Sequence, residues 1–403
     1  MFTLLPWKNL PANWLIPLLS VSCGVFVANL YYIQPLLAPI SSDLQLPLSL
    51  TSLLVTITQL GYVLGLLFIV PLCDLLENRR LILSILFVVI GALFVVFYTK
   101  NPLFLFSASL FIGIGSVATQ ILVPYAAHLA PVEHRGQAVG KVMSGLLLGI
   151  MLARPLAGLL ADLFAWNAIF LASALLTGTL TFALFAFLPA RTPSATVSYI
   201  QLLRSLWSIF KTQPVLRRRS FYQACLFGAF SLFWTTIPLW LAQAFSLSQK
   251  EIALFALVGV TGAIIAPIAG RLSDKGGTRA LTGGALLLAA TSFILMMLAS
   301  DSSKVSLFLL TLAAIILDMA VSANLVLSQR IIYSLGEEIR GRVNGIFMSL
   351  FFMGGAAGSA LGGWIYAADG WQAATYIGLV MIALALAYYS IFPDKKYAAC
   401  KNM

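Results

Sequence analysis

The chain has 403 residues, of which 61% are hydrophobic and only 9% are charged. Soluble domains carry a charge on roughly a quarter of their residues. The composition therefore excludes an ordinary soluble protein and indicates an integral membrane protein. The net charge of +11 does not indicate a nucleic-acid partner, because basic residues in cytoplasmic loops of membrane proteins give the same excess.

Residues that bind metals or carry out acid–base chemistry are scarce. The two histidines and four cysteines show no spacing typical of a metal site or a disulfide framework. No GxxxxGK[ST] loop for nucleotide phosphates is present. We therefore expect no metal, no cofactor and no enzymatic activity, and the N-terminal residues do not read as a signal peptide.

Apolar segments of about 20 residues, the length that spans a bilayer as a helix, recur along the whole chain. Lipid-facing backbone must satisfy its hydrogen bonds within a helix or a closed barrel. The sequence therefore predicts an all-α membrane protein with twelve transmembrane helices. The expected spans are 14–37, 50–72, 81–99, 103–127, 137–160, 167–189, 221–243, 251–271, 280–299, 305–328, 343–365 and 372–393.

The basic residues predict the orientation of these spans. If both termini are cytoplasmic, 20 of the 24 lysines and arginines fall on the cytoplasmic side. The opposite side holds only Lys100, Lys250 and Lys304, and the remaining basic residue, Arg154, lies inside a span. Short loops rich in lysine and arginine stay in the cytoplasm, so we expect a multi-pass protein with both termini on that side.

The longest connection divides the chain into two parts. It separates an N-terminal six-helix half (1–190) from a C-terminal six-helix half (221–403), with a cytoplasmic linker at 191–220. Apolar residues recur in the linker at helical spacing, which favours an amphipathic helix on the membrane surface. A linker that only ties the halves together is the alternative. The apolar residues are Tyr199, Leu202, Leu203, Leu206, Trp207 and Phe210.

The two halves repeat one another in sequence. EHRGQAVGKVMSGLLLG (133–149) resembles EIRGRVNGIFMSLFFMG (338–354) at a shift of 205 residues, with matching charged residues and glycines. Trp166 meets Trp371 in the same register. Repeats with an even number of helices are parallel and related by an axis along the membrane normal, an arrangement found in alternating-access carriers.

A loop motif indicates a family. The segment GRLSDKGGTR (270–279) is similar to the loop signature of the major facilitator superfamily, and VPLCDLLENRR (70–80) is a degraded copy in which Leu75 and Glu77 depart from the pattern. The stretches YYIQPLL (31–37), TQLGYVLGLLF (58–68) and GSVATQILVPYAAHLA (115–130) resemble bacterial drug and metabolite exporters of that superfamily. The matching motif residues are Asp74, Arg79 and Arg80 in the first copy, and Gly270, Asp274, Lys275, Gly277 and Arg279 in the second.

The resemblance implies a role for these loops in gating. An aspartate at the end of one helix can accept hydrogen bonds from the exposed N–H groups of a neighbouring helix start. Such a cluster, here around Asp74 and Asp274, could hold one conformation and release in the other. The alternative is that the basic residues only keep the loops in the cytoplasm.

Two departures from the family pattern weaken the inference of proton antiport. Relatives often carry Gly-Pro-x-x-Gly-Gly in helix five, where this chain has Arg154 and Leu159 at two of the glycine positions. Relatives also carry an arginine before the G-x-G of helix four, and this chain has Ser109 there.

The charge of Arg154 requires a partner, because an unpaired charge inside a membrane costs several kcal/mol. Asp318 is the one acid near the centre of any expected span. From the rise per residue, the two residues differ in depth by about 7 Å. We expect an Arg154–Asp318 ion pair that bridges the halves and couples to a proton. Alternatives are that Arg154 extends to the outer interface or binds carbonyls near Pro155, or that Asp318 binds a cationic substrate.

Other polar and aromatic residues could line a central cavity. Each could instead make a hydrogen bond between helices or anchor the chain at the interface. The candidates are Asn29, Tyr32, Gln34, Gln59, Tyr62, Gln120, Trp234, Trp240 and Asn324.

These features predict a secondary active transporter in a bacterial inner membrane. We expect a monomer, surrounded by membrane lipid, that exports a small organic solute and is coupled to protons. An importer, a uniporter or a non-transporting membrane sensor is the alternative. The identity of the substrate, the direction and the coupling ion do not follow from the sequence.

Overall fold

The computed structural model describes residues 12–131, 134–193, 198–274, 277–299, 301–336 and 338–391, and the side chains of these residues except at positions 12, 13 and 274. Throughout these ranges every regular element is a helix. The elements of the N-terminal half are α1 (Ala12–Ala28), η1 (Gln34–Leu36), α2 (Leu37–Leu44), α3 (Leu48–Leu64), η2 (Gly65–Ile69), η3 (Val70–Asp74), α4 (Asn78–Tyr98), α5 (Pro102–Ser116), α6 (Ala118–Leu129), α7 (Arg135–Leu163) and α8 (Ala168–Phe187).

The second part of the chain continues in the same way. Its elements are α9 (Tyr199–Thr212), α10 (Pro214–Ala244), α11 (Gln249–Ala256), η5 (Leu257–Val260), α12 (Thr261–Asp274), α13 (Thr278–Leu298), α14 (Lys304–Tyr333) and α15 (Arg340–Ile391). Helix α10 begins at Pro214, so residues 214–220 belong to a helix and not to the linker that the sequence predicts. Proline suits this first helical position because its missing N–H would have no partner there.

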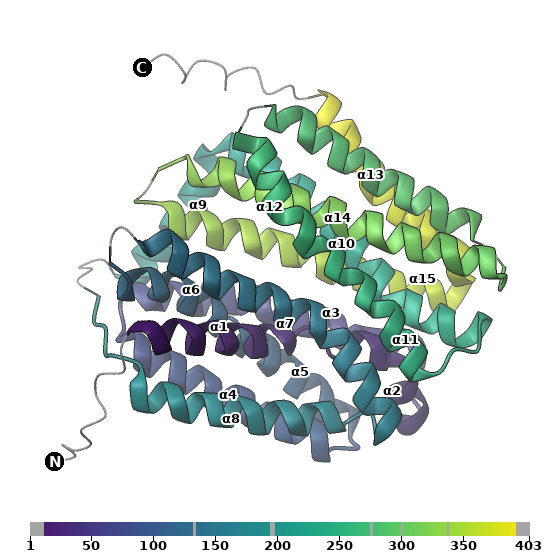
Figure 1. The fold of residues 1–403 in the computed structure, drawn as a ribbon, viewed down its shortest axis with the longest axis horizontal. Helices are drawn as coiled ribbons and strands as arrows, with labels where there is room; N and C mark the ends of the chain where they lie inside the picture. Colours follow the sequence, from purple (N-terminus) through teal and green to yellow (C-terminus); the bar gives the residue numbers. More distant parts are fainter. Residues whose placement is uncertain are drawn as a thin grey trace.

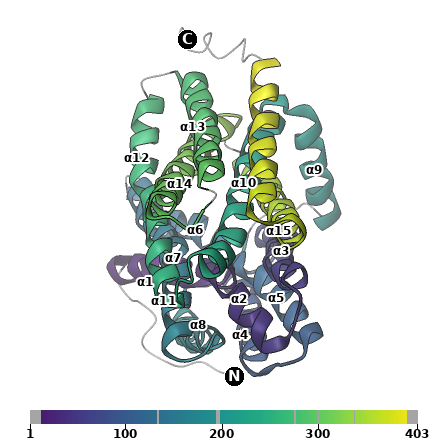
Figure 2. The same cartoon turned by 90° about the vertical axis from the view of Figure 1, so that its right-hand side faces the viewer.

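The helices up to α8 gather on one side of the molecule, and α10 to α15 gather on the other (Figures 1 and 2). At one end of the molecule lie α9 and the connection between α14 and α15, and at the opposite end lie α2 and α11 (Figure 1). We call these the α9 end and the α11 end. The predicted orientation puts the α9 end in the cytoplasm.

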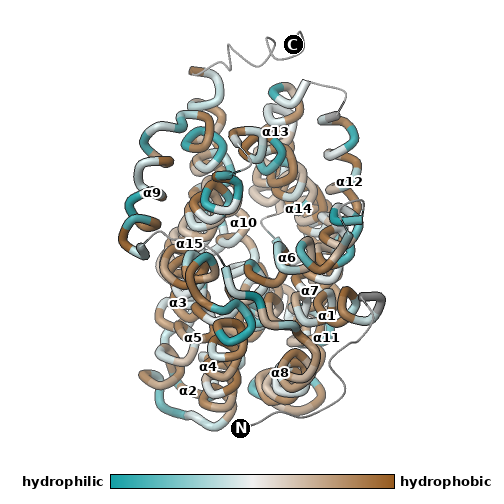
Figure 3. Tube along the Cα trace, turned by 90° about the vertical axis from the view of Figure 1, so that its left-hand side faces the viewer, coloured by the Kyte–Doolittle hydropathy of each residue, from teal (hydrophilic) through white to brown (hydrophobic). Residues whose placement is uncertain are grey.

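Ten helical segments of the described residues are long and apolar enough to cross a membrane, and a shorter apolar helix covers Trp14–Ala28. One of the ten, α15, is 52 residues long and contains the non-helical residue Gly370 (φ 78°, ψ −167°). This break lies between the expected spans 343–365 and 372–393. The all-helical membrane architecture is confirmed, whereas the number of twelve crossings stays a prediction. Figure 3, which looks at the α9 end, shows hydrophobic stretches along the helices and hydrophilic stretches mainly near their ends and in the connections.

The sequence repeat has a counterpart in how helices approach one another. In the N-terminal half, a Cβ added to Gly149 of α7 would clash with the backbone of Gly24 in α1. In the C-terminal half, a Cβ added to Gly358 of α15 would clash with the backbone of Gly228 in α10. Small residues of this kind let membrane helices pack with their backbones in contact, and both halves use them between corresponding helices.

Several of the expected spans depart from a continuous α-helix, and two of these contribute to the contact between the halves. The span expected at 14–37 is helical only to Ala28, and turns follow up to η1. The amide of Asn29 donates to the carbonyls of Val25 and Phe26, both at 3.3 Å, and so satisfies the helix end. The span expected at 251–271 changes from α11 through the tighter turn η5 to α12. Unwound backbone inside a membrane is tolerated only where it is buried in protein or lines a cavity, so both interruptions are candidates for a functional site.

The two halves meet along two helix contacts. Helix α3 packs against α15, and α7 packs against α11 and η5. Near the α11 end, a Cβ on Gly158 of α7 would lie 2.9 Å from the Cβ of Ala253 in α11. The backbone N–H of Lys250 also donates to Asp162 Oδ1 at 3.3 Å. The halves are therefore held together at the α11 end in this conformation.

The predicted linker contains a helix, α9, whose first turn is closed by a reciprocal capping box between Ser198 and Gln201. Leu202, Leu206 and Ile209 are buried, whereas Trp207 is 59% exposed. The helix therefore turns one apolar face towards the protein and leaves an aromatic side chain exposed on its other side. The placement of α9 on a membrane surface stays a prediction.

Candidate functional site

The side chain of Arg154 is buried between the two halves, with only 2% of its surface exposed. Its Nε donates a hydrogen bond of 2.6 Å to Gln34 Oε1 in η1. The interruption after α1 places Gln34 there, because the chain turns between Ala28 and η1 rather than continuing as a helix. The burial of Arg154 contradicts the alternative that its side chain extends to the outer interface.

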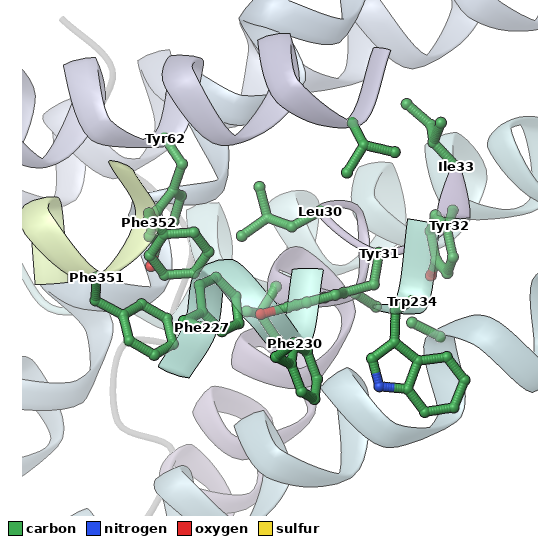
Figure 4. Packing of buried hydrophobic residues seen from close by; sticks show 14 of the residues in the cluster. Leu30, Tyr31, Tyr32, Ile33, Tyr62, Phe227, Phe230, Trp234, Phe351 and Phe352 are labelled. Carbon is green, nitrogen blue, oxygen red and sulfur yellow. The ribbon is translucent and has the colours of Figure 1, made fainter. Parts of the chain in front are cut away.

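Three aromatic rings surround the guanidinium group. Its Cζ lies 5.1 Å from the ring centre of Tyr31, 5.2 Å from that of Phe230 and 4.3 Å from that of Trp234. Tyr31 belongs to the N-terminal half, whereas Phe230 and Trp234 are one turn apart on α10 of the other half (Figure 4). A cation over an aromatic face is stabilised by about 2 kcal/mol or more when both are desolvated. Arg154 therefore binds the two halves together through aromatic faces.

Asp318 lies on α14, on the other side of Trp234, and is 5% exposed. Its Oδ2 accepts a hydrogen bond of 3.2 Å from Trp234 Nε1. Among the described residues, the one ion pair within 4.0 Å is the exposed Arg80–Glu77 pair, so the expected direct contact between Arg154 and Asp318 is wrong for this conformation. Trp234 stands between them, since its N–H faces the acid and its ring faces the base.

Gly259 explains how the two charges come close without touching. A Cβ at this position of η5 would lie 3.3 Å from Asp318 Oδ1 and 3.7 Å from Arg154 Nη1. The separation of these two atoms therefore cannot exceed the sum of the two distances. A larger residue at 259 would fill the space that the carboxylate and the guanidinium share.

A small pocket adjoins Arg154. Its walls come from η1, α7, α10 and α11, and so from both halves of the molecule. Two polar atoms beside it, Arg154 Nη2 and Gln34 Nε2, are buried and have no hydrogen-bond partner among the described residues. The lining residues are Pro35, Arg154, Trp234, Ile237, Pro238, Leu241, Ile252, Phe255 and Ala256.

A second polar contact joins the halves through α3. Gln59 Nε2 donates to Ser231 Oγ on α10 at 2.9 Å, and the hydroxyls of Thr56 and Ser359 lie 2.8 Å apart. Close to it, Gln120 Nε2 donates to Tyr62 Oη at 3.0 Å. The ring of Tyr62 in turn packs against Phe352 of α15, with ring centres 4.4 Å apart (Figure 4).

The remaining predicted residues lie within one half each. Asn29 Oδ1 accepts from Ser173 Oγ at 2.7 Å, and Tyr32 packs edge-on against Phe170, which ties the first helix to α8. Asn324 Nδ2 donates to Gln223 Oε1 at 2.7 Å.

Trp240 lies away from the charges, stacked on Trp371 with ring centres 5.7 Å apart. The structure thus brings Gln34, Arg154, Trp234 and Asp318 together and leaves Asn29, Tyr32, Asn324 and Trp240 in helix contacts.

The first loop motif is built differently from the expectation. Asp74 is exposed and, among the described residues, accepts only from the Cys73 thiol at 3.8 Å. Glu77 takes the role expected of Asp74, because its carboxylate accepts from the backbone N–H groups of Arg79 and Arg80 and so caps α4. The side chain of Arg79 donates to the carbonyl of Phe185 and lies over its ring. The gate role of Asp74 stays a prediction.

The second motif is described only in part. Lys275 lies outside the described residues, as does the side chain of Asp274. Gly277 precedes α13 with a φ of 78°, a left-handed conformation that favours glycine. Arg279 lies over the ring of Tyr389, and its carbonyl accepts from the Tyr389 hydroxyl at 3.0 Å. Gly270 faces Val326 of α14 at an ordinary contact distance of 3.8 Å from a Cβ.

Sequence reasoning missed several residues of the site. Tyr31 and Phe230 complete the aromatic surround of Arg154, and Gly259 leaves room for the two charges to approach, but none is polar enough to stand out in an apolar span. The spacing of Phe230 and Trp234, four residues apart on one helix face, is the one signal that could have grouped them.

Comparisons with known proteins identify the family. The model of the Major Facilitator Superfamily matches residues 19–332 and, in a second match, 219–402. The chain is 37% identical over 378 residues to the uncharacterized transporter YgaY of Escherichia coli O157:H7, a match that covers 94% of each chain. It is 29% identical over 362 residues to the transporter SCO4007 of Streptomyces coelicolor, covering 89% of this chain and 83% of the relative.

Solved structures share the fold. A bacterial homolog of the human lysosomal transporter Spinster, in an inward-facing and unoccupied conformation, superposes with a TM-score of 0.76 at 14% identity, covering 96% of this chain and 97% of that one. The nucleoside transporter NupG (D323A mutant) gives a TM-score of 0.74 at 15% identity over 95% and 100% of the two chains. The family-model matches and the close relatives together show that this chain belongs to the Major Facilitator Superfamily and is a multi-pass membrane transporter, not an enzyme.

Proposed function

We propose that this chain moves a small organic solute across a bacterial inner membrane by alternating access and couples that movement to protons. The observation that supports this is the buried pair of opposite charges, Arg154 on α7 and Asp318 on α14, at the contact between the halves. Intramembrane charges are costly and typically mark ion or substrate pathways. A proton on Asp318 would remove one of the two charges and so change how strongly the halves attract one another.

The same residues supply a physical basis for switching. Opening the α11 end requires α7 to separate from α10 and α11, which takes the guanidinium of Arg154 away from Phe230 and Trp234. A bound proton or solute can shift this equilibrium only by binding one of the two states more tightly. The site provides such differential contacts, because the guanidinium of Arg154 meets the aromatic faces of Phe230 and Trp234 only while the halves are joined here.

Export is the direction that the resemblance to bacterial exporters implies, with the termini in the cytoplasm, and uptake is the second hypothesis. The sign of the coupling between proton and solute decides between them. If the two compete for the site they move in opposite directions, and if they bind together they move in the same direction.

Proton coupling can be tested in proteoliposomes that contain a pH-sensitive dye. A panel of organic solutes is added to the wild type, to Asp318→Asn and to Asp369→Asn, an exposed acid on α15 that serves as the matched control. We expect solute-dependent proton movement for the wild type and the control, and none for Asp318→Asn. Gradient-driven transport by Asp318→Asn that equals the wild type would exclude Asp318 as the coupling residue.

A further inference from the structure

Two buried hydrogen-bond donors beside the Arg154 pocket lack an acceptor. Arg154 is 2% exposed and Gln34 is 1% exposed, yet Arg154 Nη2 and Gln34 Nε2 have no partner among the described residues. Because Arg154 Nε and Gln34 Oε1 are joined by a hydrogen bond of 2.6 Å, the two free donors belong to one cluster. A buried donor without an acceptor is destabilising, so an acceptor that enters the site would recover this free energy.

The chemistry of this cluster selects the acceptor. A guanidinium edge and an adjacent amide N–H present two donors and one positive charge, which match the two oxygens of a carboxylate. The rest of the pocket is apolar, with Ile237, Leu241, Ile252 and Phe255 among its walls. In this conformation the pocket is closed and has room for about one water molecule. Resting on the transport function proposed above, we propose that, once the halves part here, Arg154 and Gln34 bind the carboxylate of a monoanionic organic solute, and its apolar body lies against α10 and α11.

The surrounding charges exclude other solute classes. A cation would have to approach the guanidinium of Arg154, whose charge repels it. A phosphate or another polyanion would bring two or more negative charges to a site that has one arginine and, close by, the carboxylate of Asp318. A single negative charge on an apolar body is what the site can neutralise.

Asp318 gives the coupling its sign. The charged or titratable groups that face Asp318 are Arg154 from α7 and, beyond it, Tyr31. The basic residues of the helices packed around Asp318 lie near helix ends: Arg217, Arg218 and Arg219 on α10, Arg271 on α12, Arg279 on α13, Lys304 and Arg330 on α14, and Arg340 and Arg342 on α15. An ionised Asp318 competes with a solute carboxylate for Arg154, whereas a protonated Asp318 does not. Proton and carboxylate therefore bind together and move in the same direction, which favours uptake over export.

Binding to the purified full chain in detergent tests this without any gradient. Thermal-shift titrations compare phenylacetate, phenylacetamide, phenethylamine and phenylalanine, and in parallel hexanoate, hexanamide and hexylamine. We expect the two carboxylates to bind at least about tenfold more tightly than the matched amides and amines, since a desolvated charged pair contributes more than a neutral hydrogen bond. The affinity for the carboxylates should rise about threefold or more as the pH falls from about 8 to about 6, because binding takes up a proton.

Three variants sharpen the test. Gln34→Glu puts a carboxylate beside Arg154, and it should abolish carboxylate binding while leaving the chain folded. Arg154→Gln should remove the preference for the acid over the amide, whereas Arg204→Gln, an exposed arginine on α9 outside the site, should keep it. Asp318→Asn imitates the protonated acid, so it should bind the carboxylates at least as tightly as the wild type and without the rise at low pH.

The proposal is overturned if the amides or amines bind as tightly as the carboxylates, if no carboxylate binds, or if Gln34→Glu binds them normally. Tighter binding of phenylalanine than of phenylacetate would replace it with a zwitterion site that also uses Asp318. The proposed function can fail separately. If carboxylates bind but gradient-driven transport is absent, the proton coupling is excluded and the carboxylate site still stands.

Discussion

The two contacts that join the halves differ in their chemistry. Between α3 and the C-terminal half, neutral side chains pair with one another, as Thr56 does with Ser359 and Gln59 with Ser231. Around α7, by contrast, a charged guanidinium is held by aromatic faces and one amide, and it keeps a donor without a partner. Each contact keeps a buried polar atom without a partner among the described residues, Gln59 Oε1 at the first and Arg154 Nη2 at the second, but only the second carries a charge. We therefore expect protons and solutes to act at the charged contact around Arg154.

The comparison between the two contacts predicts the largest loss of transport for Gly259→Val. Its Cβ would lie 3.3 Å from Asp318 Oδ1, and the branched atoms would enter the space between the charges. Overpacking costs about 1–3 kcal/mol, so we expect transport to fall by about tenfold or more in proteoliposomes. Gly284→Val is the matched control, because a Cβ there meets no atom within 4 Å. Equal losses in both variants would show that the space between the charges is not the cause.

An intermediate effect is expected from Trp234→Phe. The ring over Arg154 remains, but the N–H that donates to Asp318 Oδ2 is lost. A typical intramolecular hydrogen bond contributes about 1 kcal/mol, which corresponds to about fivefold, so the rate of gradient-driven transport should fall about fivefold. Trp240→Phe makes the same change in a tryptophan that stacks on Trp371 away from the charges, and it should transport like the wild type. A wild-type rate in Trp234→Phe would mean that Asp318 does not need this donor.

The smallest effect is expected at the neutral contact. Ser359→Ala removes the hydroxyl that lies 2.8 Å from the Thr56 hydroxyl. Hydrogen bonds between membrane helices contribute about 0.6 kcal/mol on average, so thermal unfolding should shift only slightly and transport should stay within about twofold of the wild type. A strong loss of transport with an unchanged unfolding temperature would contradict the contrast drawn between the two contacts.

Much of the fold followed from the sequence because the bilayer limits what a chain can do. Apolar length, absent charges and the need to satisfy backbone hydrogen bonds predict membrane helices without any tertiary information. The repeat at a shift of 205 residues predicted two similar halves, and the structure adds that corresponding helices approach closely in both, as Gly149 does with Gly24 and Gly358 with Gly228.

The candidate site followed only in part. Arg154 and Asp318 were predictable because a buried charge is rare, whatever surrounds it. The prediction of a direct contact between them was wrong for this conformation. Depth along two straight helices does not reveal the indole of Trp234 between them or the turn that carries Gly259.

The sequence by itself therefore determined which charged side chains lie inside the membrane. The free-energy cost of such a charge depends on the side chain and on its depth, and both can be read from the sequence. Only the tertiary structure decided what each one touches. The unwinding after Ala28 brings Gln34 to Arg154, and the bend at η5 brings Gly259 between the charges. Both are departures from regular helices that are stable because the packed halves bury them, so they depend on residues far apart in the chain.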